Sequence, residues 1–226
     1  MSHFSVAVFS HGMSEIEGLL APYCEEVEPE SEYSEFVKDD DSEYDEVTGE
    51  KGYWRNPNAK WDWYEIGGRW KGMLKLLPGK ESYCSALGCR TNDLKHPLRS
   101  CDSALVADCD FSPDEDTYKN AIHKWKVVVE GTDEKEGDEE YLYVYGPQYY
   151  LDRHGDKETY ARRTAACMTY AFISVDGEWH GQGRMGWFGM DDSNNESIGA
   201  YEKEFEEYLE KAHKEGLTIT IVDCHI

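Results

Sequence analysis

Residues 193–226, SNNESIGAYEKEFEEYLEKAHKEGLTITIVDCHI, contain the clearest helix and the clearest strand of the chain. Apolar residues recur there every three or four positions, which is the spacing of one helix face: Ile198, Tyr201, Phe205, Leu209 and Ala212. Ser193 and Glu196 predict a capping box at the start of this helix, and Gly216 predicts its end. Leu217–Asp223 is rich in β-branched residues, which indicates a strand. This stretch therefore predicts a helix packed on a sheet.

Patterns of the same kind extend outward to the rest of the chain. The predicted strands are His3–Ser10, Arg69–Leu77, Val127–Val129, Tyr141–Tyr145, Met168–Val175 and Glu178–His180. The further predicted helices start at Ser14 (ending near Pro22), at Ser112 and at Lys157 (ending near Ala166). Asp176-Gly177 predicts a tight hairpin turn. Because no repeat or linker interrupts the pattern, we expect a single α+β domain over residues 1–226, with a mostly antiparallel sheet and three or four helices.

Charge is distributed unevenly along the 226 residues. The chain holds 47 acidic residues against 23 Lys and Arg, a net charge of −24. Residues 25–50 hold 13 acidic residues and one lysine, and residues 130–140 hold 7 and one. Such blocks are typical of solvated or partly disordered insertions. The alternative is an acidic surface that mimics nucleic acid or attracts a basic partner.

The composition also excludes several classes of function. Double-stranded nucleic acid is disfavoured as a partner, because phosphate binding needs clustered Lys and Arg. No apolar run reaches the roughly 18–20 residues that cross a bilayer, so we expect no membrane partner. The first residues show no basic region before an apolar stretch, which favours a cytoplasmic protein over a secreted one. Oligomeric state is left open, and a homo-oligomer is one possibility.

The cysteines do not predict a metal site. There are seven, and an odd count without a secretion signal favours reduced thiols. Cys84, Cys89, Cys101 and Cys109, with His96 between them, are separated by more residues than structural zinc sites use. We therefore expect no metal and no cofactor.

The segment WDWYEIGGRW, residues 61–70, is the most unusual in composition. Aromatic side chains can stack on a base or a sugar, and a guanidinium can bind a phosphate or carboxylate with two hydrogen bonds. The candidate residues are Trp61, Trp63, Tyr64, Gly67, Gly68, Arg69 and Trp70. The alternative is a core cluster in which Arg69 stacks on tryptophan and pairs with an acidic neighbour.

A second candidate is the glycine-rich segment WHGQGRMGWFG, residues 179–189. Arg184 and Trp187 could contact a ligand there, since binding sites concentrate on loops held by a rigid scaffold. A loop that packs closely on its own core would explain the glycines equally well.

The last residues offer acid–base or metal chemistry. On a strand, Asp223 and His225 share a face, whereas Cys224 points the other way. Asp223 and His225 could act as an acid–base couple, or could bind a metal with His3, His11 or His180. A terminal strand with a hydrogen-bonded histidine is the alternative.

Four segments together resemble a family of uncharacterised proteins from tailed bacteriophages and prophages. They are MSHFSV at residues 1–6, NPNAKWDWYEIGGRW at 56–70, GWFG at 186–189 and VDCHI at 222–226. The resemblance implies an accessory protein that acts in the cytoplasm of a bacterial host, commonly against host defence.

Three hypotheses follow from the residues and the resemblance. In the first, the protein binds and sequesters a small anionic ligand, of nucleotide or cyclic-nucleotide type, through residues 61–70, Arg184 and Trp187. In the second, the acidic segment 25–50 mimics nucleic acid and blocks a host defence protein. In the third, the protein is an enzyme that uses Asp223 and His225 on a nucleotide. The lack of a hydrolase motif favours a binding protein over an enzyme.

Overall fold

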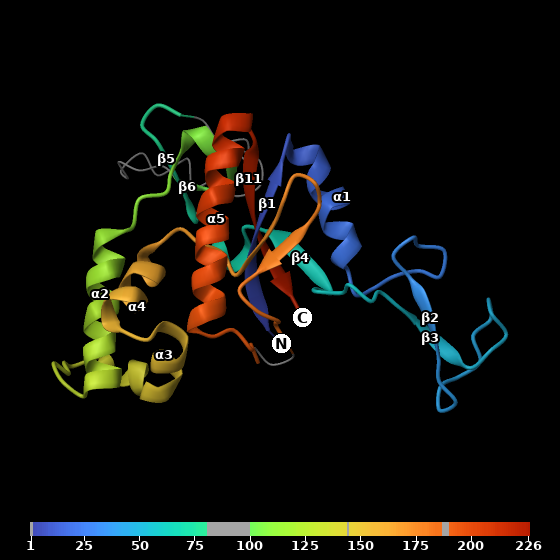
Figure 1. The fold of residues 1–226 in the computed structure, drawn as a ribbon, viewed down its shortest axis with the longest axis horizontal. Helices are drawn as coiled ribbons and strands as arrows, with labels where there is room; N and C mark the ends of the chain where they lie inside the picture. Colours follow the sequence, from blue (N-terminus) through green and yellow to red (C-terminus); the bar gives the residue numbers. More distant parts are fainter. Residues whose placement is uncertain (1, 81–99, 144, 187–189) are drawn as a thin grey trace.

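The computed structural model describes residues 2–80, 100–143, 145–186 and 190–226 (Figure 1). The central sheet contains, in spatial order, β10 (Trp179–Gly181), β9 (Ala171–Ile173), β1 (His3–Ser10), β11 (Thr218–His225) and β4 (Trp63–Ile66). A further strand, β7 (Ser103–Leu105), pairs with the first half of β11, whose second half pairs with β4. All these pairings are antiparallel except that of β1 with β9. The predicted α+β class and mostly antiparallel sheet are confirmed.

The two central strands organise the core. β1 and β11 pair along eight positions, from His3 opposite His225 to Ser10 opposite Thr218. Because side chains alternate along a strand, each face of the sheet receives every second residue. One face packs on α5 (Asn195–Glu215), and the other packs on the short helix α1 (Ile16–Leu20). Both faces are therefore buried, and none of the eight β11 residues is exposed.

The remaining helices form a separate layer beside α5 (Figure 1). They are α2 (Glu115–Trp125), α3 (Pro147–His154) and α4 (Lys157–Ala165). Trp125, Tyr150 and Tyr160 pack together between them, with ring centroids 5.3–6.4 Å apart. With α1 and α5 they make five α-helices in the described part of the chain, none of which is long and apolar enough to cross a membrane.

Two small sheets flank the body. β5 (Leu74–Leu76) pairs with β6 (Ser100–Cys101) and β8 (Cys109–Asp110). β2 (Glu35–Lys38) and β3 (Gly52–Arg55) form a hairpin within residues 25–58, which we call the arm. Figure 1 shows the arm projecting from the body. The predicted acidic insertion 25–50 thus lies in a segment with its own strands and its own aromatic contact, Phe36 on Trp54 at 5.3 Å.

Two predicted strands are wrong. Val127–Val129 lies in a π-helical turn, Lys126–Glu130, that continues α2, and residues 141–143 lie in a 3-10 helix, Asp138–Tyr143. Apolar residues occupy these positions because Val127 and Val128 are buried. Val128 packs on the aromatic residues of the helical layer. Burial against helices and burial in a sheet select the same β-branched residues, so the pattern did not separate them.

Several predicted boundaries also differ from the structure, among them that of the strand Met168–Val175, of which only Ala171–Ile173 is a strand. Arg69–Leu77 is not one strand: a 3-10 turn, Gly68–Trp70, precedes β5. The start of the first helix shifts too, because a 3-10 turn, Met13–Glu15, precedes α1 and no side chain caps it. In α2 the N-cap is Asp114 rather than Ser112, since the Asp114 carboxylate accepts the Thr117 N–H at 2.8 Å.

The capping box of α5 is displaced by one residue. Asn194 is the N-cap, and Ser197 accepts its backbone N–H at 3.0 Å. Ser193 lies one residue before the cap, and its hydroxyl donates to Asp191 at 2.7 Å. The predicted end at Gly216 is confirmed, with φ at 69°.

Candidate functional site

The aromatic residues of segment 61–70 do not surround one guanidinium. Trp61 is buried in the core, 6% exposed, with its ring edge-on to Tyr64 at 5.2 Å. Trp63 points to the opposite face of β4, where it is 44% exposed and stacks on His225 at 5.1 Å. Strand alternation separates Trp63 from Tyr64, because β4 sends them to opposite faces of the sheet, and Trp61 precedes β4 and packs with Tyr64. Their predicted contacts with one ligand remain a prediction, and Trp61 has no exposed ring face to offer it.

The glycines of this segment serve an internal contact. Gly67 and Gly68 have φ angles of 74° and 48°, and a Cβ on Gly68 would lie 2.4 Å from Cβ of Asp223. The close approach lets the backbone N–H of Arg69 donate to Asp223 Oδ2 at 2.9 Å. The Arg69 side chain is exposed. The predicted turn at the two glycines is confirmed, and the N–H group that follows them binds Asp223.

The glycine-rich loop after β10 packs closely on the chain. A Cβ on Gly183 would lie 2.7 Å from Asp192 Oδ1, and that same oxygen accepts the backbone N–H of Arg184 at 2.6 Å. Gly186 donates its N–H to the carbonyl of Met190 at 2.6 Å. These bonds hold the backbone of Arg184 while its side chain stays exposed. Trp187, the other candidate in this loop, lies outside the described residues.

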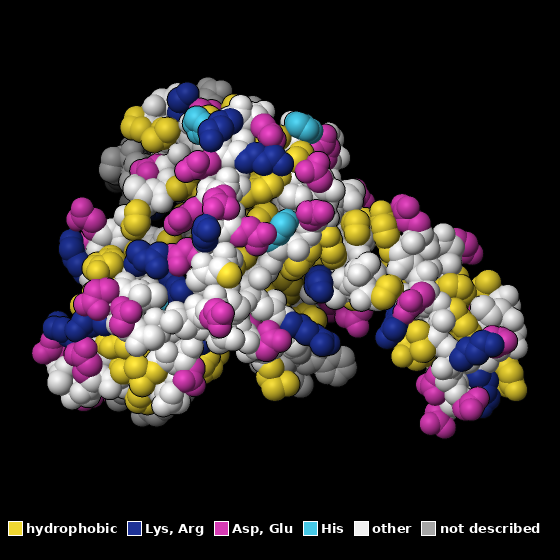
Figure 2. Space-filling model, viewed as in Figure 1, with side chains coloured by type: hydrophobic (Ala, Val, Ile, Leu, Met, Phe, Trp, Pro, Cys, Tyr) yellow, Lys and Arg dark blue, Asp and Glu magenta, His cyan; other side chains and the backbone are white. Residues whose placement is uncertain are grey.

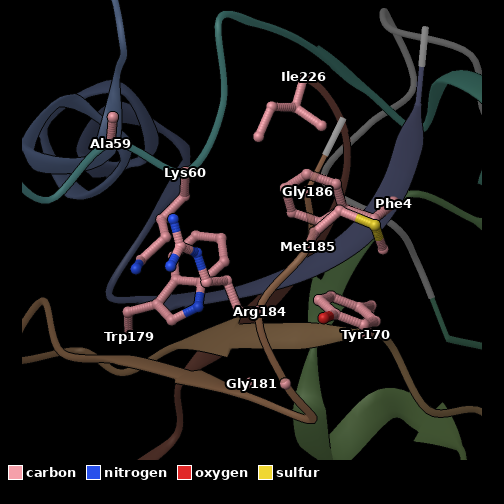
Figure 3. Close-up of a pocket in the computed structure, with 11 residues that line it drawn as sticks. Phe4, Ala59, Lys60, Tyr170, Trp179, Gly181, Arg184, Met185, Gly186 and Ile226 are labelled. Carbon is pink, nitrogen blue, oxygen red and sulfur yellow. The ribbon is translucent and has the colours of Figure 1, made fainter. Parts of the chain in front are cut away.

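Arg184 lines a cavity of about 370 Å³, which we call the Arg184 cavity. The other side chains that form it are Phe4, Ala59, Lys60, Tyr170, Trp179, Met185 and Ile226. Figure 3 shows Lys60 and Arg184 at the Trp179 end, with Phe4, Met185 and Tyr170 at the other. The volume lies within the roughly 300–1,000 Å³ that small-molecule sites occupy. Lys60, Phe4 and Tyr170 were not predicted as ligand contacts, because five separate stretches of the chain supply the walls. Trp179 lies within the predicted segment 179–189.

The charged side chains that line this cavity are positive, whereas the net charge of the chain is negative. Among the described residues no Asp or Glu side chain lines it, and neither Lys60 nor the Arg184 guanidinium forms an ion pair. By contrast, Figure 2 shows Asp and Glu side chains over both the body and the arm. Lys60 is held in place through its backbone, whose N–H donates to the Tyr23 carbonyl at 2.8 Å. Two cations over aromatic walls can bind an anionic group that is attached to a flat ring.

A second cavity, of about 610 Å³, adjoins the first. We call it the His3 cavity. Phe4, Tyr170 and Met185 line both cavities, so they form a shared wall. The remaining lining residues are His3, Ser5, Trp70, Tyr145, Tyr149, Arg153, Met190 and Asp191. Trp70 is thus the one candidate of segment 61–70 that lines either cavity.

A hydrogen-bonded network fixes part of the wall of the His3 cavity. Asp191 accepts from Arg153 at 2.6 Å and from the Tyr170 hydroxyl at 3.0 Å. Burial alone would raise the pKa of Asp191, but hydrogen bonds from Ser193 and from Arg153 outweigh it and hold that pKa below its usual range. Burial and the Asp191 charge together raise the pKa of Tyr170. The Arg153 charge is therefore neutralised by Asp191, and Tyr170 stays a neutral donor.

Two histidines on the neighbouring strands β1 and β11 each bind a carboxylate through Nδ1. His3 bonds Asp223 at 2.8 Å, and His225 bonds Asp62 at 2.7 Å. The two rings lie edge to face, with centroids 4.9 Å apart. The predicted Asp223–His225 couple is therefore corrected: the two residues share a face of β11, but each bonds a partner from another strand or loop. His225 Nε2 is buried without a hydrogen-bond partner in the described chain.

In the part of the chain that the structure describes, no group of three or more His, Cys, Asp or Glu side chains could hold a metal ion. Cys84, Cys89 and His96 lie outside that part. In comparisons with known proteins, no family model, no curated protein and no solved structure matches the chain.

Proposed function

We propose that this protein binds a small anionic ligand with an aromatic ring, of nucleotide or cyclic-nucleotide type, in the Arg184 cavity. The observation that carries this proposal is the pair of cations, Lys60 and Arg184, that have no acidic partner among the described residues and lie in an aromatic-walled cavity of a chain with net charge −24. Lys60 and Arg184 bind the phosphate, and the indole of Trp179 stacks on the base. The sequence resemblance to bacteriophage proteins supports the role of sequestering a nucleotide signal of host defence.

The experiment is a thermal-shift series on the full chain with nucleoside mono- and diphosphates and cyclic nucleotides. A ligand at 100 times its Kd adds about 2.7 kcal/mol to the free energy of unfolding. For a chain of this size that is a shift in Tm of roughly 5–10 °C. Arg184→Ala and Lys60→Ala each remove a charged hydrogen bond, so we expect roughly a tenfold or greater rise in Kd.

Arg69→Ala is the matched control. Arg69 is another exposed arginine, but it does not line the Arg184 cavity. We expect this variant to bind as the parent does, although the sequence predicted Arg69, together with Arg184, as a phosphate ligand. Retained affinity in Arg184→Ala, or loss confined to Arg69→Ala, would contradict the proposed site.

The arm supports a second candidate function, the blocking of a host protein that binds nucleic acid. Its tip carries acidic residues beside exposed apolar ones, with Tyr44 72% and Val47 63% exposed. A basic groove could contact both kinds of side chain. A variant in which residues 26–55 are replaced by a short Gly-Ser linker separates the two functions. It should keep the nucleotide-dependent Tm shift and lose any inhibition of a nuclease.

A further inference from the structure

The His3 cavity contains the parts of a general base. His3 Nδ1 lies 2.8 Å from Asp223 Oδ1, and an ionised carboxylate can only accept, so Nδ1 carries the hydrogen of this bond. The free lone pair of the His3 ring is then on Nε2, which does not bond Asp223. The His3 side chain lines the cavity. This is the tautomer that a base needs.

The position of the imidazole is fixed from several sides. Asp223 is itself 2% exposed, and its second oxygen accepts the Arg69 N–H at 2.9 Å. The His3 ring makes edge contacts with Trp63 at 5.4 Å and with His225 at 4.9 Å. A base held in this way loses little entropy when it reacts.

The adjoining Arg184 cavity supplies the positive charge that a phosphate-bearing substrate needs. Arg153 is paired with Asp191, whereas Lys60 and Arg184 have no acidic partner among the described residues and line the Arg184 cavity, across the shared wall of Phe4, Tyr170 and Met185. A nucleotide whose base stacks on Trp179 and whose first phosphate binds Lys60 and Arg184 could extend its phosphate chain over that wall toward His3.

We infer that His3 is the general base of a nucleotide hydrolase, and that its substrate is a nucleoside di- or triphosphate. This inference rests on the proposed binding function and extends it to a reaction. His3 Nε2 takes a proton from water as the water oxygen bonds to the terminal phosphorus. The P–O bond of the anhydride breaks, and the electron pair goes to the bridging oxygen of the departing nucleotide, which leaves as a phosphate anion. The imidazolium then releases its proton to solvent. Asp223 is a positioning residue that holds the tautomer and the ring.

The test measures phosphate release from ATP, GTP and ADP by the full chain, with and without Mg²⁺. General-base catalysis contributes about 10²–10⁴-fold, so His3→Gln should lower kcat by at least ~10²-fold with KM little changed. His3→Ala should recover part of the lost rate when imidazole is added, which a purely structural role would not produce. Asp223→Asn should lower kcat while the nucleotide-dependent Tm shift is retained.

His123→Gln is the matched control, because His123 bonds the Asp138 carboxylate at 2.8 Å but lines neither cavity. We expect its rate to stay within twofold of the parent rate. Binding without phosphate release, or release that is equal in His3→Gln, would overturn the inference and leave the binding function intact. No Tm shift and no release would overturn both. Release that depends on His3 but not on Lys60 or Arg184 would support the base and contradict the proposed binding site.

Discussion

At the scale of single residues, the backbone packs tightly on Asp223, and Gly68 makes this close approach possible. A Cβ at Gly68 would lie 2.4 Å from Cβ and 2.5 Å from Oδ2 of Asp223, and the φ angle of 48° is one that other residues rarely adopt. We expect Gly68→Ala to lower the free energy of unfolding by roughly 2–4 kcal/mol, the sum of backbone strain and overpacking. Urea denaturation measures this change.

The control variant Gly131→Ala separates the backbone strain from the overpacking on Asp223. Gly131 has a φ of 66°, but nothing lies within 4 Å of a Cβ built there. The control should lose only about 1–2 kcal/mol, which is the cost of the left-handed backbone. Equal losses in the two variants would show that the contact with Asp223 adds nothing.

At the scale of elements, α5 depends on an N-cap that the sequence pattern placed one residue early. The Asn194 side chain accepts N–H groups from Glu196 at 2.9 Å and Ser197 at 3.1 Å. We expect Asn194→Ala to destabilise the protein by about 0.5–2 kcal/mol, whereas Asn194→Asp keeps the acceptor and should lie close to the parent. Chemical denaturation of the three proteins measures this. A stable Asn194→Ala protein would show that packing of α5 on the sheet makes the cap dispensable.

Elements with a strong period were predictable from sequence, and these include α2 and α4 of the helical layer, whereas the π-helical turn that continues α2 was not. Local patterns predict α5, β1, β11 and the β9–β10 hairpin directly. In each of them the spacing of the apolar residues shows which positions are buried. Val127–Val129 looked like a strand because the π-helical turn buries the same residue types. The site was predictable only in part: Arg184 stood out by its glycine-rich loop, whereas Lys60 and Tyr170 have no local signature and are joined to it by the fold. The His3–Asp223 bond likewise joins the two ends of the chain, across 220 positions of sequence.

At the scale of the whole molecule, the arm is separable from the body. No residue between 25 and 58 belongs to the three core clusters of the described residues. The base of the arm is closed by backbone bonds, such as Glu25 N–H to the Trp61 carbonyl at 2.7 Å. Asn56 also donates to the carbonyls of Pro22 and Cys24, both at 2.8 Å. The two ends of the arm are therefore adjacent, and a short linker can join them.

Replacing residues 26–55 with such a linker should leave a body that melts cooperatively, and the effect on Tm should depend on salt. The arm carries much of the acidic charge, and like charges destabilise a compact state at low ionic strength, where the Debye length reaches about 30 Å at 0.01 M. We therefore expect the Tm of the full chain to rise more between 0.01 and 0.5 M NaCl than the Tm of the shortened chain. Melting curves of both proteins across this range measure the difference.

Because the linker variant retains Asn56 and Lys60, its Arg184 cavity should stay complete. A shortened chain that unfolds, or that responds to salt as strongly as the full chain, would show that the arm is integral to the body and that the remaining acidic surface governs the electrostatics.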